Sequence, residues 1–193
     1  MGNEILSMAQ PNSSDASFTE TVKSELISFY GNKENIDDRV FQIINRTSPL
    51  SLRILDYFAV NFARQQRVFY NVNNKPFDVY TSYKTNLEYF KKKRFDPFRR
   101  HSRIDLTYSE KDRIQTTIGQ LCFFRWCLQN KVLDYVEKNI NVITEDMKRY
   151  YLNRATEKIE GGKTRKSSRR RSNIHVSAIR TSNGNEKYIV TFD

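Results

Sequence analysis

The chain has 193 residues, a formal net charge of +11 and a pI near 9.7. This length allows one sizeable core, or one domain with tails. No apolar run approaches the roughly 18 residues of a membrane span, and the N-terminus has no basic region followed by an apolar one, so we expect neither a membrane-spanning helix nor secretion.

The cysteine and histidine content argues against a metal centre. Cys122 and Cys127 have neither the spacing of a redox motif nor that of a zinc knuckle, and two histidines cannot complete a ligand set. Both cysteines lie in a strongly apolar segment, which is typical of buried, reduced thiols in a cytosolic or nuclear protein. We therefore expect no metal and no other cofactor.

The N-terminal region is predicted to be a tail followed by a helix. Residues 1–16 are polar, small and rich in Ser and Asn, so they cannot bury enough surface to order themselves and are predicted to be a disordered tail. Ser17 and Glu20 form a capping-box pattern ahead of an apolar stripe, and Gly31 is placed to end that helix. The folded domain is therefore expected to begin at residue 17.

Two more helices and a small β element are expected next. Residues 37–45 carry the apolar pattern of a short helix. Ser48 is predicted to cap the following helix, with Pro49 at its first position, where a missing N–H loses no hydrogen bond. Short strands are expected within residues 67–80, around the turn chemistry of residues 73–76.

Residues 80–103 combine positive charge with aromatic rings. They hold eight Lys and Arg side chains against two acids, Glu88 and Asp96. Because cations neutralise phosphates and exposed aromatic rings stack on bases, this mixture favours a nucleic-acid surface. The candidate contacts are the cations Lys84, Lys91, Lys92, Lys93, Arg94, Arg99, Arg100 and Arg103, the neighbouring His101, and the rings of Tyr89, Phe95 and Phe98.

An alternative interpretation makes the same stretch an ordinary amphipathic helix. On a helix capped by Thr81, the side chains of Tyr83, Leu87 and Phe90 would face a core, and the lysines would be the solvated side. Pro97 ends that helix, since proline disfavours helical geometry at the residue before it. Whether the aromatic rings stack on bases or pack in the core depends on their exposure.

Residues 116–139 are the most apolar segment of the chain. They predict two helices, broken near Asn130, at the centre of the core. A helix-turn-helix that reads a DNA groove is an alternative, but its second helix would carry Asp134 and Glu137 toward phosphates.

The remaining elements complete one mainly helical domain. A strand is expected at residues 103–108, which alternate, and a helix from Thr144 to Ile159, because acids favour its start. We therefore predict a mainly α fold with a small β element (α+β), with a helical core domain over residues 17–160.

A second basic stretch and a hairpin are predicted after this domain. The linker, residues 161–173, has no acid and is open to three interpretations: a nucleic-acid tail, a nuclear localisation signal or a solvated spacer. Residues 174–193 alternate on either side of a turn and predict a C-terminal β-hairpin, which would dock on the domain, pair with a partner or order on binding. The cations of the linker, all candidate contacts, are Lys163, Arg165, Lys166, Arg169, Arg170 and Arg171.

Several short sequence motifs carry a family resemblance. They are FDVY at 77–80, FDPFRR at 95–100, TTIGQL with FFRW within 116–126, VLDY at 132–135 and IVTFD at 189–193. Through these motifs the chain resembles, over residues 50–193, a family of short basic proteins encoded by nucleocytoplasmic large DNA viruses of protists. The family has no settled activity. The resemblance implies a virion or viral factory in the host cytoplasm, or the host nucleus, and a large DNA genome nearby.

The sequence favours binding over catalysis. It has no P-loop, dinucleotide fingerprint, G-x-S-x-G or H-E-x-x-H motif, and His101 has no matching nucleophile or carboxylate cluster, so we do not expect an enzyme. The leading hypothesis is sequence-independent nucleic-acid binding, in the packaging or handling of viral DNA or RNA. The alternative is a structural or virion protein whose basic surface and C-terminal hairpin bind a viral protein partner. A continuous surface over both basic stretches would favour the first hypothesis, and an open hairpin edge the second.

Overall fold

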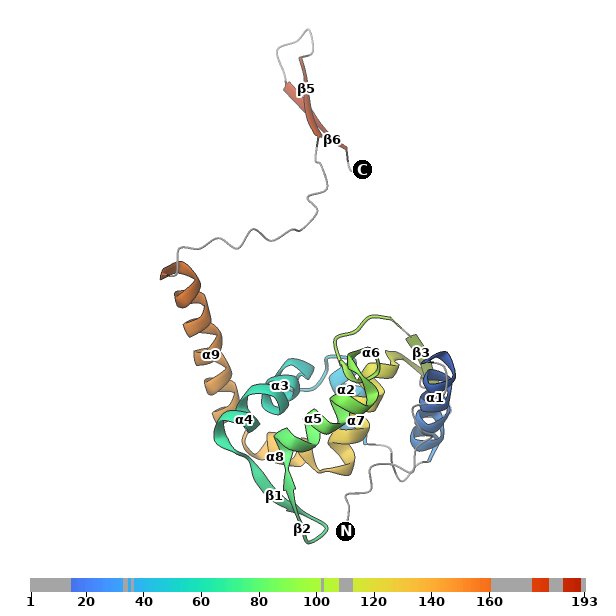
Figure 1. The fold of residues 1–193 in the computed structure, drawn as a ribbon. Coiled ribbons are helices and arrows are strands. Elements are labelled where there is room, and N and C mark those ends of the chain that lie inside the picture. Colours follow the sequence, from blue (N-terminus) through green and yellow to red (C-terminus); the bar gives the residue numbers. More distant parts are fainter. Residues whose placement is uncertain are drawn as a thin grey trace. The chain divides into compact units, whose positions relative to one another are not determined.

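A computed structural model of the chain describes residues 15–32, 35, 37–101, 103–107, 113–160, 175–180 and 186–191. The chain divides into two compact units, Met1–Asn153 and Arg154–Asp193. Helices predominate and the strands pair two by two, so the predicted mainly helical α+β class is confirmed (Figure 1). The helices are α1 (Asp15–Gly31), α2 (Asp38–Ile44), α3 (Leu52–Tyr57), the π-helix η2 (Phe58–Phe62), α4 (Ala63–Gln66), α5 (Val79–Phe90), α6 (Lys92–Phe95), α7 (Ile118–Gln129), α8 (Val132–Lys138) and α9 (Ile140–Glu160). The antiparallel strand pairs are β1 (Phe69–Val72) with β2 (Lys75–Asp78), β3 (Arg103–Thr107) with β4 (Arg113–Thr117), and β5 (His175–Arg180) with β6 (Glu186–Thr191).

Helix α7 forms the centre of the core of the first unit. Helices α1 and α6 pack against it (Figure 1). Its Phe124 is fully buried. The hydroxyl of Tyr30 on α1 donates a buried hydrogen bond of 2.9 Å to the carbonyl oxygen of Leu121. Cys122 and Cys127 of this helix are buried and free, as the apolar segment predicted.

Helices α7 and α8 meet at the predicted break near Asn130. Lys131 lies between them with a φ of 53° and turns the chain sharply. Arg39 of α2 binds the carboxylates of Asp134 and Glu137 on α8 at 2.8 and 2.9 Å. The two acids that argued against a recognition helix therefore tie α8 to α2.

The helix predicted to start at Ser48 starts later. The side chain of Ser51 caps α3 by accepting a 3.3 Å hydrogen bond from the N–H of Ile54, while the Ser48 hydroxyl accepts one of 3.1 Å from the N–H of Leu50. With Ser51 as the cap, buried Leu50 precedes it and buried Leu55 lies one turn inside the helix, which is the arrangement of a hydrophobic staple. Burial of these two side chains thus decides between two competing caps.

Strands β1 and β2 form the hairpin that the turn residues indicated. Asn73 and Asn74 form a two-residue turn in which both have a positive φ, 50° and 63°, a conformation that asparagine tolerates. Lys75 and Pro76, expected in the turn, begin β2 instead.

Helix α5 follows β2 directly and is capped earlier than predicted. The carboxylate of Asp78 accepts a 3.1 Å hydrogen bond from the N–H of Thr81, so Asp78 is the cap and Thr81 lies in the first turn. The cap moves because the strand runs without a loop into the helix.

The basic helix is broken at Lys91, which has a φ of 60° and a ψ of 160°. On one straight helix, positions 90 and 95 would point about 140° apart. The break lets Phe90 and Phe95 both enter the core, where their rings stack with centroids 5.9 Å apart. Core packing therefore divides the predicted helix into α5 and α6.

Two helices begin earlier than predicted. Helix α1 starts at Asp15 and not at Ser17, with a carboxylate at its first position, where the helix dipole favours negative charge. Helix α9 starts at Ile140 and not at Thr144, and this extra turn carries the fully buried Ile143.

In the second unit, β5 and β6 pair antiparallel from His175 opposite Thr191 to Arg180 opposite Glu186. The predicted tail up to residue 14, the linker residues 161–173 and the hairpin loop lie outside the described residues. Within the described part of the chain, no helix combines the length and the apolar composition that crossing a membrane requires.

Candidate nucleic-acid interface

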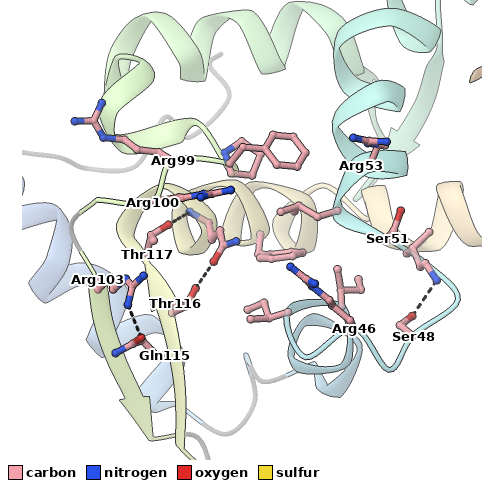
Figure 2. Close-up of a pocket in the computed structure, with 18 residues that line it drawn as sticks. Arg46, Ser48, Ser51, Arg53, Arg99, Arg100, Arg103, Gln115, Thr116 and Thr117 are labelled. Carbon is pink, nitrogen blue, oxygen red and sulfur yellow. Dashed lines mark hydrogen bonds between the residues drawn. The ribbon is translucent and has the colours of Figure 1, made fainter. Parts of the chain in front are cut away.

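A cavity of about 910 Å³ opens between the α2–α3 segment, the loop after α6 and the junction of β4 with α7 (Figure 2). Its lining combines arginines, neutral polar side chains and apolar side chains, and none of the lining residues is acidic. The polar lining consists of Arg46, Arg53, Arg99, Arg100, Arg103, Ser48, Ser51, Gln115, Thr116, Thr117 and Gln120. The apolar lining consists of Ile43, Ile44, Leu50, Leu52, Pro97, Phe98 and Phe124.

The arginines reach the cavity from separate segments. Arg46 follows α2 in the left-handed conformation, with a φ of 63°, and Arg53 lies in the first turn of α3. Arg99 and Arg100 follow the turn at Pro97 after α6, and Arg103 begins β3. In Figure 2, Arg46 and Arg100 approach the open space from opposite sides, whereas Arg99 extends away from the others.

Hydrogen bonds fix the wall formed by β4 and α7. The hydroxyl of Thr117 caps α7 by accepting a 3.2 Å hydrogen bond from the N–H of Gln120. The hydroxyl of Thr116 donates a 2.9 Å hydrogen bond to the side-chain oxygen of Gln120, and Arg103 donates one of 3.0 Å to the side-chain oxygen of Gln115. This wall therefore ends at the N-terminus of a twelve-residue helix, where the dipole favours anions.

The positive charge of the cavity is not neutralised by ion pairs among the described residues. None of its five arginines forms an ion pair with a described carboxylate. Charges of one sign around a concave surface focus the field and attract ions of the other sign. Guanidinium groups also match phosphate geometry through two parallel N–H donors. The cavity is thus suited to a phosphate-bearing ligand.

Two cations predicted as phosphate contacts form ion pairs with a carboxylate of the chain itself. Arg94 is 5% exposed, binds the carboxylate of Asp15 at 2.9 Å and lies 4.5 Å over the ring of Phe18. Lys93 forms an ion pair with the same carboxylate. We correct the assignment of Arg94 in particular, because its burial and its partner leave the guanidinium inaccessible to a phosphate.

The predicted stacking rings also divide by exposure. Phe95 is completely buried, so it is a core residue and the prediction that it stacks on a base is corrected. Tyr89 is half-buried and contacts the ring of Phe18 edge-on at 5.8 Å. Phe98 is 50% exposed and lines the cavity. Of the three rings, Phe98 alone presents an exposed face at the cavity.

The structure brings only part of the predicted set together. Arg99, Arg100 and Arg103 line the cavity. The exposed Lys84, Lys91, Lys92 and His101 are not part of its lining. The prediction that both basic stretches form one continuous surface falls outside the described residues, because it depends on the linker cations. These are Lys163, Arg165, Lys166, Arg169, Arg170 and Arg171.

Arg46 and Arg53 are the cavity arginines that the sequence did not indicate. Each is an isolated cation in a segment with no excess of charge, so the density of Lys and Arg, which identified residues 80–103, gives no signal there. Only the packing of α2 and α3 beside the loop at Pro97 brings them to the other arginines.

One carboxylate near this region has a perturbed pKa. Burial raises the pKa of Asp56, on α3, from its ordinary 3.8 to about 6, and the charge of Asp96 adds to the effect while Lys92 opposes it. Because the folded state holds the proton more tightly than the unfolded chain, Asp56 favours folding at low pH, and this contribution is lost as the pH rises through about 6.

Asp56→Asn should therefore stabilise the protein at pH 7 and leave its stability nearly unchanged at pH 4. We expect a gain of about 1–2 kcal/mol at pH 7, after allowing for the partial solvation of the carboxylate. Urea denaturation of both proteins at the two pH values measures it. An equal difference at both pH values would assign the effect to packing and not to titration.

The model of one protein family matches most of the chain. The sequence profile of a family of unknown function, DUF7197, matches residues 12–190. The chain belongs to this family. The match includes most of the N-terminal fifty residues, which the resemblance in the sequence had left outside.

A relative of the chain comes from a virus, as the resemblance implied. An uncharacterized protein, L507, of Acanthamoeba polyphaga mimivirus is 36% identical over 118 residues, which cover 56% of this chain and 46% of the relative. The chain thus spans about half the length of the curated relative. No solved structure matches. These comparisons support an uncharacterized viral family, and the expectation that its members are short and basic stays a prediction.

Proposed function

We propose that this chain binds nucleic acid through the arginine cavity, without reading its sequence. The observation that carries the proposal is the convergence of arginines from separate segments on one concave surface, with no described carboxylate among them. A fold that only displayed charge for solubility would spread it over convex faces and pair much of it. Clustered, unpaired guanidinium groups instead offer contacts to successive phosphates.

The same proposal covers the setting of the protein. A large DNA virus must package and handle its genome and transcripts, so we place the chain in the virion or viral factory, in the host cytoplasm or nucleus. The proposed action is binding, for which the guanidinium groups and hydroxyls of the cavity offer contacts to phosphates.

A second candidate function rests on the C-terminal hairpin. Strands β5 and β6 form a two-stranded sheet within the described residues, and a strand at the edge of a sheet can add a strand from a partner. The competing proposal is therefore a structural or virion protein whose hairpin and positive charge bind a viral protein.

The triple variant Arg46→Gln, Arg53→Gln, Arg100→Gln tests the nucleic-acid proposal. Affinity of the full chain for labelled DNA and RNA, measured across a salt series, should fall about tenfold or more at low salt. The slope of log affinity against log salt should become shallower by about 0.7–0.9 for each phosphate that the variant no longer neutralises.

A charge-matched control separates the cavity from net charge. Lys75→Gln, Lys131→Gln, Lys138→Gln removes the same formal charge from exposed positions outside the cavity and should change affinity little. Equal losses in both triple variants would reject the cavity as the binding site. Absence of binding by the unmodified chain at low salt would reject nucleic-acid binding and favour the hairpin-mediated function.

A further inference from the structure

The cavity has an apolar component that a purely phosphate-binding surface does not need. In its lining, Phe98 is exposed and Ile44 and Leu52 are partly exposed, next to the exposed side chains of Arg46, Arg53 and Arg100. Apolar lining with a few placed polar groups is typical of sites that enclose a ligand. The lining therefore suits a ligand with both an anionic part and a flat apolar part.

Phe98 is the side chain placed to receive that flat part. It is 50% exposed and lines the cavity together with Arg99 and Arg100, which follow it in the chain. Its main-chain N–H donates a 2.9 Å hydrogen bond to the carboxylate of Asp96, and Pro97 precedes it with a fixed φ. The ring is thus held on a restrained turn beside the cations, as a platform.

Duplex and single strand present different surfaces to such a cavity. A duplex stacks its bases inside and offers a convex ridge of phosphates, so the apolar lining and the ring of Phe98 would gain no partner. A single strand exposes base faces next to its phosphates, and the stacking of a base on an aromatic ring does not depend on sequence. The volume of about 910 Å³ is at the upper end of cavities that enclose small ligands, which is enough for a short segment of a strand.

We infer that the cavity binds a single-stranded segment of nucleic acid, with phosphates on Arg46, Arg53 and Arg100 and a base on the ring of Phe98. This inference rests on the proposed nucleic-acid binding and adds the form of the nucleic acid to it. The preference for single strands arises in the cavity, because only an unpaired base can reach the ring.

The test compares a labelled single-stranded oligothymidine, which has no self-structure, with a duplex of the same length on the full chain. We expect the single strand to bind about tenfold or more tightly than the duplex. Phe98→Ala should weaken single-strand binding about tenfold, as removal of one base–aromatic stack does, and leave duplex binding unchanged. Phe98→Tyr, which keeps an aromatic face, should retain the preference.

The outcomes distinguish failure of this inference from failure of the proposed nucleic-acid binding on which it rests. Equal affinity for both forms, or Phe98→Ala weakening both alike, overturns the single-strand inference and leaves nucleic-acid binding in place. Absence of binding to either form rejects the proposed function as well. Displacement of the strand by thymidine monophosphate at equal nucleotide concentration would make the cavity a site for free nucleotides and also overturns the inference. Thermal unfolding of each variant confirms that the fold persists.

Discussion

Phe95→Ala should lower the free energy of unfolding by about 3–5 kcal/mol, the usual cost of removing a buried aromatic ring. The ring is completely buried and lies 5.7 to 6.2 Å, between ring centroids, from the rings of Tyr83, Phe90, Phe123 and Trp126. These neighbours belong to α5 and α7. The void left by alanine would therefore lie where α6 packs against both helices, and the surrounding side chains could not easily move in to fill it. Equilibrium denaturation in urea measures the change.

Phe98→Ala is the matched control for this prediction. It is the same chemical change three positions along the chain, but the ring is half exposed, and we expect a cost below about 1 kcal/mol. If Phe95→Ala leaves too little folded protein to measure, Phe95→Leu should give a smaller but measurable loss. Similar costs for Phe95→Ala and Phe98→Ala would contradict the assignment of Phe95 to the core.

Elements whose signals are local were predictable from the sequence. The turn at Asn73 and Asn74, the strand at residues 103–107 and the break near Asn130 each depend on a few adjacent residues whose backbone preferences agree. Where two residues within one turn compete for one role, the sequence does not decide. Ser48 and Ser51 can both cap a helix, and the choice follows from which apolar side chains the tertiary fold buries.

The candidate site was predictable only where its residues are clustered in the sequence. Arg99 and Arg100 stood out by the local density of charge. That density could not distinguish Arg94, which is buried against Asp15, from its accessible neighbours, because burial depends on the contact of α6 with α1. Arg53 is the opposite case, a residue that lines the cavity but was not predicted. A single cation gives no local excess of charge, and it becomes part of a site only through packing.

Gly119→Ala should destabilise the protein by about 2–3 kcal/mol, although alanine is the better helix former by about 1 kcal/mol. Gly119 lies in the first turn of α7, and a Cβ there would overlap the main-chain carbonyl oxygen of Asp96. That oxygen accepts a 3.2 Å hydrogen bond from the N–H of Arg99, so it cannot turn aside without breaking a bond of the loop. Steric overlap therefore outweighs helix propensity.

The same substitution should also weaken nucleic-acid binding several-fold. The turn that it would displace holds Phe98 and Arg100 in the lining of the cavity. Gly31→Ala is the matched control: among the described residues outside its own helix backbone and its chain neighbours, no atom lies within 4 Å of a Cβ at that position, so we expect no loss of stability and no change in affinity. Denaturation and binding measured on both variants give the result. A Gly119→Ala protein as stable as the unmodified chain would show that α7 and the loop at Asp96 are not in close contact. A destabilised variant with unchanged affinity would show that binding does not depend on the position of this loop.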